Sequence, residues 1–385
     1  MEKLWKYKKI GEVCIVERGA SPRPIDKYIT DNESGINWIK IGDTSDSMYI
    51  TETAQKIIVE GMKKSRYVKP GDFLLSNSMS FGRPYILKID GCIHDGWLVL
   101  RDENALFDKR FLYYYLSSKT TYKKLKSMAV GGVVNNLNSE MVRNVIVPVP
   151  DKEEQSEIAD LFDKIKKILD DRKQELEQLD TLVKSRFAEM FGDISDDEKK
   201  TMADICTIIT DGTHQPPKFV SEGIPFLFVS NIVTNEISYD TQKFISEETY
   251  AKLIKRTPIE IGDILLSTVG SYGHPAVVKK EKPFCFQRHI AYLKPNADMV
   301  DSEYLRGAIL SADVQRQIDE GVKGIAQKTL NLSEIRKIKL PLPPIDRQKQ
   351  VAAFVAQTDK SKSKIQKSLE ETQLLFDSLM QKYFG

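Results

Sequence analysis

Side chains that form directed hydrogen bonds gather in three loops of this sequence, and each loop occurs twice. The members of each pair agree at turn and core positions but differ in their polar residues. The pairs are "RGASPRP" (18–24) and "DGTHQPP" (211–217), "SNSMSFGRP" (76–84) and "STVGSYGHP" (267–275), and "GGVVNNLN" (131–138) and "GIAQKTLN" (324–331).

The chemistry of these loops favours recognition of nucleic acid. Asn, Gln, Arg, Lys, Ser and Thr are the side chains that read base edges and hold phosphates. Taken singly, each such residue is an ordinary turn or surface residue, so the prediction depends on the paired pattern. The predicted DNA-binding residues are Ser21, Arg23, Lys40, Asn77, Ser78, Arg83, Asn135, Asn136, Thr213, His214, Gln215, Asn231, Thr268, Ser271, Tyr272, His274, Arg288, Gln327 and Lys328.

Motifs for catalysis are missing from the sequence. It contains no Walker A loop, no HExxH, no G-x-S-x-G and no [ND]-P-P-[YF] of amino-methyltransferases. The one Glu-x-Lys sequence, at 198–200, lies in a polar linker rather than beside an acidic strand. The four histidines and four cysteines lack the spacing of metal ligands. We therefore expect no catalytic residues, no metal and no cofactor in this chain.

The paired loops belong to an internal repeat of the whole chain. "GDFLLSNSMSFGRP" at 71–84 returns as "GDILLSTVGSYGHP" at 262–275, and the later match runs without a gap to the last residue. Short β-rich runs bounded by Gly, Pro, Asn and Asp, together with one predicted helix in each copy, at 108–128 and 301–320, predict an α+β domain in each copy. The predicted boundaries are domain 1 at 1–150, a spacer helix at 151–192, a linker at 193–200, domain 2 at 201–343 and a second spacer helix at 344–385.

Each copy ends in a stretch with the apolar spacing of a long coiled-coil helix. Residues 152–190 contain no Pro or Gly, and a helix of that length extends about 58 Å, too far for one domain to cover. We expect the two helices to pair antiparallel about a pseudo-twofold axis between the two domains, although each could instead fold back on its own domain. The predicted seam is Ile158, Phe162, Ile165, Leu169, Leu176, Leu179, Val183, Val351, Val355, Ile365, Leu369, Phe376 and Leu379.

Polar residues interrupt this seam in both helices. The predicted roles are to set the register between the helices or to face another protein. The interrupting residues are Arg172, Arg186, Thr358, Lys362 and Thr372.

Composition limits the size of any nucleic-acid surface and the expected cellular location of the protein. The net charge is only +2, so any nucleic-acid surface must be a local patch. No run of about 18 apolar residues exists, and the first residues lack a signal core, so a cytoplasmic protein is expected. The four cysteines lie in apolar runs and are expected to be small buried strand residues.

The order of domain, Pro-rich joint and long helix, repeated once, resembles the specificity subunits of type I restriction-modification systems. The resemblance covers essentially the whole chain. It is carried by "VKPGDFLLS", "IEIGDILLS", "LNSEMVRNVIVPVPDKEEQSEIA" and "LNLSEIRKIKLPLPPIDRQKQVA". It implies two target recognition domains, each reading one half of a bipartite, asymmetric site in double-stranded DNA through the major groove.

The same resemblance implies partners for the chain. The helices would set the spacing between half-sites and dock two methyltransferase subunits, through which restriction subunits join. S-adenosylmethionine and ATP would belong to those partners. The alternatives are a self-contained modification or restriction enzyme, which the missing motifs disfavour, and a coiled-coil scaffold whose domains bind proteins.

Overall fold

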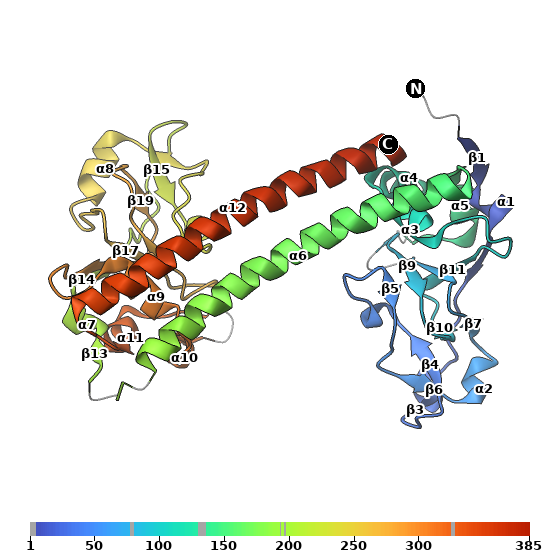
Figure 1. The fold of residues 1–385 in the computed structure, drawn as a ribbon, viewed down its shortest axis with the longest axis horizontal. Coiled ribbons are helices and arrows are strands. Elements are labelled where there is room, and N and C mark those ends of the chain that lie inside the picture. The colour runs from blue at the N-terminus through green and yellow to red at the C-terminus, as the bar shows by residue number, and fades with distance from the viewer. Residues whose placement is uncertain (1–4, 78–80, 130–135, 193, 196–197, 325–327) are drawn as a thin grey trace. The chain divides into compact units, whose positions relative to one another are not determined.

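A computed structural model describes residues 5–77, 81–129, 136–192, 194–195, 198–324 and 328–385. The chain forms two compact units (Figure 1). The first comprises residues 1–171 and 369–385, and the second comprises residues 172–368. Each unit therefore contains one domain of the repeat and parts of both long helices.

The central sheet of the first unit is covered on both faces. Alternate residues of the central strands enter different cores: Phe73 and Leu75 face the core that holds the helices, whereas Leu74 faces a second core. Burial on both faces explains why "FLLS" is continuously apolar. The strand order is β2 (Ile15–Arg18), β11 (Trp97–Arg101), β8 (Phe73–Ser76), β9 (Pro84–Leu87) and β5 (Tyr49–Ile50).

A smaller sheet extends the first unit beyond this second core. Its strands β4 and β10 are parallel, with Cys92 paired to Trp38. The strand order is β3 (Ile29–Thr30), β6 (Lys56–Ile57), β4 (Ile36–Ile39), β10 (Gly91–Ile93) and β7 (Arg66–Val68).

The second unit repeats the order of the inner strands of both sheets, which supports the internal repeat, although its described residues form one strand fewer in the central sheet and two fewer in the smaller one. Its central sheet has the order β14 (Cys206–Asp211), β20 (Ile290–Pro295), β17 (Ile264–Ser267) and β18 (Pro275–Val277). Its smaller sheet is β16 (Phe244–Ile245), β15 (Ile224–Leu227) and β19 (Cys285–Phe286), with β15 and β19 again parallel.

The helical stretch predicted in each copy is divided in two by a serine. Ser118 separates α3 (Lys109–Ser117) from α4 (Lys119–Ala129), and its hydroxyl accepts a hydrogen bond from the Thr121 N–H at 3.1 Å. Ser311 stands between α9 (Ser302–Ile309) and α10 (Ala312–Gly321) and caps α10 in the same way. A serine that accepts from the N–H of the third residue after it caps the start of a new helix.

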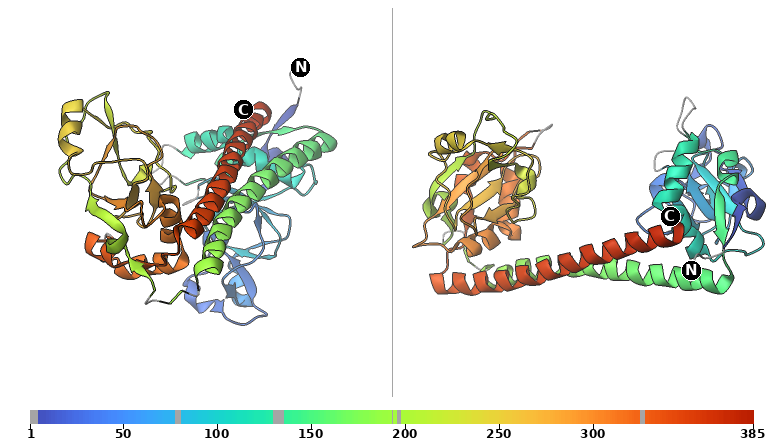
Figure 2. Two further views of the ribbon diagram at one scale, coloured as in Figure 1. Left: turned by 60° about the vertical axis from the view of Figure 1, so that its left-hand side comes forward. Right: turned by 90° about the horizontal axis from the view of Figure 1, so that it is seen from above.

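The long helices α6 (Lys152–Phe191) and α12 (Ile345–Phe384) contact each other within each unit (Figure 2). In the first unit Phe162 near the start of α6 contacts Phe376 and Phe384 near the end of α12. In the second unit Asp180, farther along α6, pairs with Lys362, earlier on α12. Partners that move in opposite directions along the two helices define an antiparallel pair, as predicted.

The predicted seam residues are all buried or half-buried. Two of the polar interruptions contact the other helix: the Arg172 guanidinium donates to the Ser368 carbonyl, and Lys362 pairs with Asp180. These contacts support the register-setting role. Arg186 instead pairs with Glu189 of its own helix.

A buried glutamine joins each long helix to its own domain. The Gln155 amide donates to the carbonyls of Pro150 (2.9 Å) and Leu106 (3.2 Å), and its oxygen accepts from the Asp108 N–H (2.8 Å). Gln348 makes the same three bonds in the second unit, at 2.8, 3.0 and 2.9 Å, to Pro343, Met299 and Asp301. We call these two contact sets the glutamine clasps.

The cysteine prediction is confirmed for Cys92 and Cys285, which are buried strand residues of β10 and β19. It is wrong in part for the other two: Cys14 is buried but lies just before β2 rather than in it, and Cys206, at the start of β14, is only half-buried. Across the described ranges, no helix is both long and apolar enough to cross a membrane.

Candidate nucleic-acid interface

Two equivalent tight turns lie at the centre of the candidate sites. In the first unit the turn between β10 and β11 is closed by the Trp97 N–H and the His94 carbonyl at 3.1 Å. In the second unit the turn between β19 and β20 is closed by the Ile290 N–H and the Gln287 carbonyl, also at 3.1 Å. Two predicted polar loops of each unit bond to its turn through their backbone, at Gly19 and Asn77 in the first unit and at Thr213 and Thr268 in the second.

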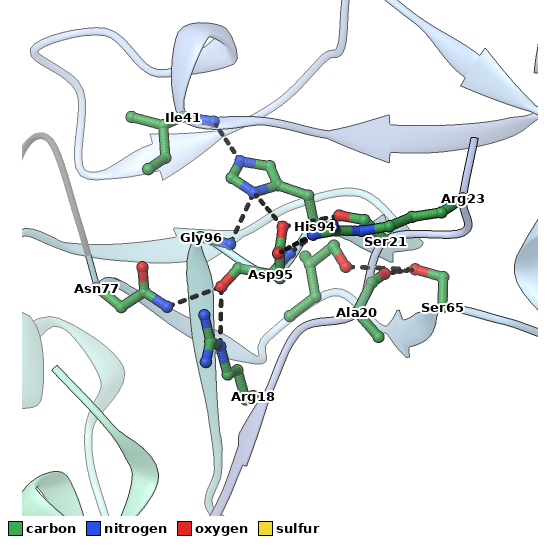
Figure 3. A network of polar contacts seen from close by, with 11 residues as sticks. Arg18, Ala20, Ser21, Arg23, Ile41, Ser65, Asn77, His94, Asp95 and Gly96 are labelled. Atoms are coloured by element: carbon green, nitrogen blue, oxygen red, sulfur yellow. Dashed lines mark hydrogen bonds and ion pairs between the residues drawn. The ribbon is translucent and has the colours of Figure 1, made fainter. Parts of the chain in front are cut away.

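In the first unit, the carboxylate of Asp95 connects two predicted residues (Figure 3). The Ser21 hydroxyl donates to its Oδ1 at 2.8 Å, and the Arg23 guanidinium donates to its Oδ2 at 3.2 Å. Burial opposes ionisation, but the hydrogen bonds from Ser21 and from the backbone N–H of Asp95 outweigh it and lower the pKa of Asp95. Asp95 is therefore ionised at neutral pH.

The backbone of this turn is also held from two sides. The Asn77 amide donates to the Asp95 carbonyl at 2.8 Å, and the Arg18 guanidinium donates to the same oxygen at 3.0 Å. Asn77 is only 1% exposed. Asn77 therefore positions the backbone of the Asp95 turn and is too buried to contact DNA itself.

A pocket of about 780 Å³ adjoins Asp95. It collects three predicted residues, Ser21, Arg23 and Lys40, against an apolar wall that includes Trp38. Lys40 donates to the Gln55 side chain at 2.8 Å. His94 also lines the pocket, and burial lowers its pKa, so that the imidazole is neutral at pH 7.

Arg83 lies apart from this pocket, after the loop that follows β8. Its guanidinium donates to the Ser45 carbonyl at 3.1 Å and pairs with Asp46 at 3.2 Å. Both side chains of the ion pair are substantially exposed, so nucleic acid could replace Asp46 at small cost.

In the second unit, Thr213 and His214 line a pocket of about 240 Å³ together with Lys252 and Arg256. His214 and Arg256 both contact the carboxylate of Asp211. This pocket therefore combines a hydroxyl, an imidazole and two cationic side chains.

A second pocket of about 240 Å³ in this unit contains Thr268 and Arg288. The Arg288 side chain is exposed, and its Nε lies 3.4 Å from the His289 ring. The pocket also includes Asp211 and His289. Burial, aided by the charge of Arg288, lowers the pKa of His289, so that its ring is neutral at pH 7.

The loop after β17 carries the other predicted residues of the second unit. The Ser271 hydroxyl lies 3.1 Å from a ring nitrogen of His274, and the Tyr272 hydroxyl donates to Asp319 at 2.9 Å. Asn231 is 7% exposed, and its side chain bonds to backbone groups of Phe228, Ser238 and Asp240. Asn231 thus shapes its loop, and we leave it out of the proposed contact surface.

The remaining predicted residues are less constrained. Gln215 and Lys328 are exposed and Asn136 is half-buried. Ser78, Asn135 and Gln327 lie outside the described residues.

Sequence reasoning missed the charged residues that organise both sites. Asp95 and Asp211 are acidic and so lack the donors expected of DNA-binding side chains, and Lys252 and Arg256 lie outside the matched loops. The sequence did hold a signal for Asp95, because "IHDGW" aligns with "FQRHI", where the equivalent residue is Arg288. Within the described ranges, no group of three or more His, Cys, Asp or Glu side chains is arranged to hold a metal ion.

Comparison with known proteins places the chain in a family. The sequence family "Type I restriction modification DNA specificity domain" matches twice, at residues 2–179 and 194–372. The chain therefore belongs to the family of type I restriction-modification specificity subunits, and it contains two of its DNA specificity domains. The predictions of that family and of an α+β fold with paired long helices are confirmed.

Individual relatives are distant in sequence. The EcoBI specificity subunit of Escherichia coli is 24% identical over 313 residues, a match that spans 72% of this chain and 65% of that protein. The MjaVIII specificity subunit of Methanocaldococcus jannaschii is 20% identical over 377 residues, spanning 92% and 86%.

Solved structures share the fold. The S subunit of a type I system from M. genitalium superposes with a TM-score of 0.56 at 15% identity, covering 100% of this chain and 97% of that chain. A chain from a structural study of complex assembly and conformational transition of the type I R-M system gives 0.60 at 17% identity, covering 99% and 97%.

Proposed function

We propose that this chain is the DNA-reading subunit of a type I complex, in which each domain reads one half of a bipartite, asymmetric site. The observation that carries the proposal is the repeat of one backbone scaffold with different polar side chains. Gly19 and Gly212 make equivalent bonds to the strands β11 and β20, yet the residues that follow are Ala-Ser-Pro-Arg in one unit and Thr-His-Gln-Pro in the other. Two such surfaces read two different sequences.

The proposed contact surface comprises exposed or half-buried predicted residues of each unit, at the turn and in the loops beside it. In the first unit these are Ser21, Arg23, Lys40 and Arg83. In the second they are Thr213, His214, Gln215, Ser271, Tyr272, His274, Arg288 and Lys328. The basic members supply phosphate contacts, so binding weakens as salt concentration rises.

The proposal extends to partners. The helices α6 and α12 fix the spacing between the half-sites and dock two methyltransferase subunits, through which restriction subunits join. Those subunits bind S-adenosylmethionine and ATP. A subunit of this kind works on the chromosome of its host, in the cytoplasm.

The test is a base-resolution map of adenine methylation in the native host, with this gene intact and with it deleted. The expected result is that one split, asymmetric motif loses its methylation on deletion and regains it when the gene is restored. An unchanged map, in a host that expresses the methyltransferase partner, would reject the proposal.

A further inference from the structure

The two turns at the centre of the candidate sites carry opposite charges at one equivalent position. Asp95 is the second residue of the turn His94–Trp97, and Arg288 is the second residue of the turn Gln287–Ile290. The residue after each accepts a backbone bond in the same way: the Gly96 carbonyl from the Asn77 N–H and the His289 carbonyl from the Thr268 N–H, both at 3.0 Å. Asp95 and Arg288 are therefore structural equivalents.

The neighbouring strand shows the reverse exchange of charge. Arg18 ends β2 in the first unit, where Asp211 ends β14 in the second. The equivalence follows from the next residue, because the N–H of Gly19 bonds to the Trp97 carbonyl and that of Gly212 to the Ile290 carbonyl. The two units thus present differently placed donors and acceptors on one scaffold.

Asp95 is an exposed acceptor held in a fixed geometry. Its side chain is 42% exposed, although Ser21 and Arg23 each donate to one of its oxygens. A carboxylate has about four lone-pair sites, so both oxygens retain the capacity to accept from a ligand. Asn77 and Arg18 hold its backbone, which limits the ordering that binding would require.

Arg288 is an exposed donor. Within the described part of the chain, no carboxylate forms an ion pair with it, and its Nε contacts only the neighbouring His289 ring. The backbone N–H of Arg288 donates to the Thr213 carbonyl at 3.0 Å. This bond fixes the backbone from which the guanidinium extends. The fork of donors on the guanidinium remains available for a planar acceptor pair.

We infer that Asp95 and Arg288 are the residues that make the two half-sites different. Carboxylates accept from the N4 amino group of cytosine, and guanidinium groups donate to O6 and N7 of guanine. The first domain thus reads a cytosine through Asp95, and the second reads a guanine through Arg288. This inference rests on the proposed function and adds to it the bases and the residues.

The test uses the whole complex in the host, with Asp95→Asn or Arg288→Gln replacing the natural residue, and maps adenine methylation. Amides favour adenine, so each variant is expected to relax its own position toward adenine. Asp95→Asn should change one C·G pair in one half of the motif and leave the other half intact. Arg288→Gln should change one G·C pair in the other half only. Discrimination at the affected pair should fall by about 5- to 150-fold.

A conservative variant and a surface control complete the experiment. Asp95→Glu keeps the carboxylate and should keep the preference for cytosine, whereas Arg316→Gln, which removes an exposed arginine on α10, should leave the whole motif unchanged.

Three outcomes would overturn the inference. The methylated motif could stay unaltered, it could weaken equally at every position, or it could change at a position that is an A·T pair in the natural motif. Loss of all methylation in both Asp95 variants would also overturn it, because it would assign Asp95 a structural role. If deletion of the natural gene leaves methylation unchanged, the proposed function itself has failed.

Discussion

Replacing Gln155 with leucine should destabilise the first unit while leaving the second intact. Gln155 is 1% exposed and makes three hydrogen bonds to backbone groups, none of which leucine can replace. Each such bond contributes about 0.5–1.5 kcal/mol net, and an orphaned buried partner raises the cost. We expect the free energy of unfolding of this unit to fall by about 2–4 kcal/mol.

The chain contains its own reporter for this experiment. Trp5, Trp38 and Trp97 are its three tryptophans, and all belong to the first unit. Tryptophan fluorescence during urea unfolding therefore follows that unit, whereas circular dichroism follows both. At a slope of about 2 kcal/mol per molar urea, the middle of the usual range of about 1–3, the fluorescence midpoint should fall by about 1–2 M.

The second glutamine clasp supplies the matched comparison. Gln348→Leu should lower a transition seen by circular dichroism and leave the fluorescence midpoint in place. Gln357→Leu, at an exposed position of the same helix, should change neither by more than about 0.5 kcal/mol. If Gln155→Leu and Gln348→Leu each unfold at the same urea concentration as Gln357→Leu and the natural protein, the clasps contribute nothing and the reasoning is refuted.

Three further predictions concern stability. Burial raises the pKa of Cys14, Cys206 and Cys285 to about 12 and that of Cys92 to about 11, from an ordinary value of 9.0. Because the thiols of the unfolded chain therefore ionise first, the free energy of unfolding should fall as the pH rises above about 9. Urea titrations from pH 8 to 10 measure this, and a variant with all four cysteines replaced by alanine should show a smaller fall; an equal fall would reject the thiols as the cause. Arg143→Met removes a guanidinium bond to the Val16 carbonyl (2.7 Å) and should cost about 1.5–3 kcal/mol by fluorescence-detected unfolding, while an unmoved midpoint would contradict that role. Lys362→Glu places like charges beside Asp180 and should cost about 1 kcal/mol by circular dichroism; Asp180→Lys in the same chain should restore it, and failure to restore would show that the two side chains do not interact.

The repeat and the long helices could be predicted because both depend on the spacing of residues that lie close together in the sequence. Heptad positions and matched turn residues survive whatever lies around them, so α6 and α12 begin and end within a residue or two of their predicted bounds. The break at Ser118 was missed, because the apolar residues on both sides of it read as one helix. The break is shown by the extended backbone of Ser118 (φ −65°, ψ 145°), which ends α3, and by its capping bond to Thr121, which begins α4.

The candidate site was harder to predict, because its organisation comes from contacts that are distant in sequence. Asp95 accepts a hydrogen bond from Ser21, which lies 74 residues away in the sequence, and nothing in the loop "IHDGW" predicts that contact. Asn77 was selected for its amide, yet folding directs that amide to the backbone of the Asp95 turn. The match between Gln155 and Gln348 was visible in the sequence, but the three bonds that each one makes required the structure.

The glutamine clasps have a consequence for heredity. Each clasp joins a helix to backbone groups of its domain, carbonyls and one N–H, rather than to particular side chains. A genetic crossover at the Pro-rich joint before α6 would therefore join a foreign first domain, whose main chain offers the same partners, to the existing helices and second domain. Under the proposed function, the descendant would acquire a new pairing of half-sites in a single event.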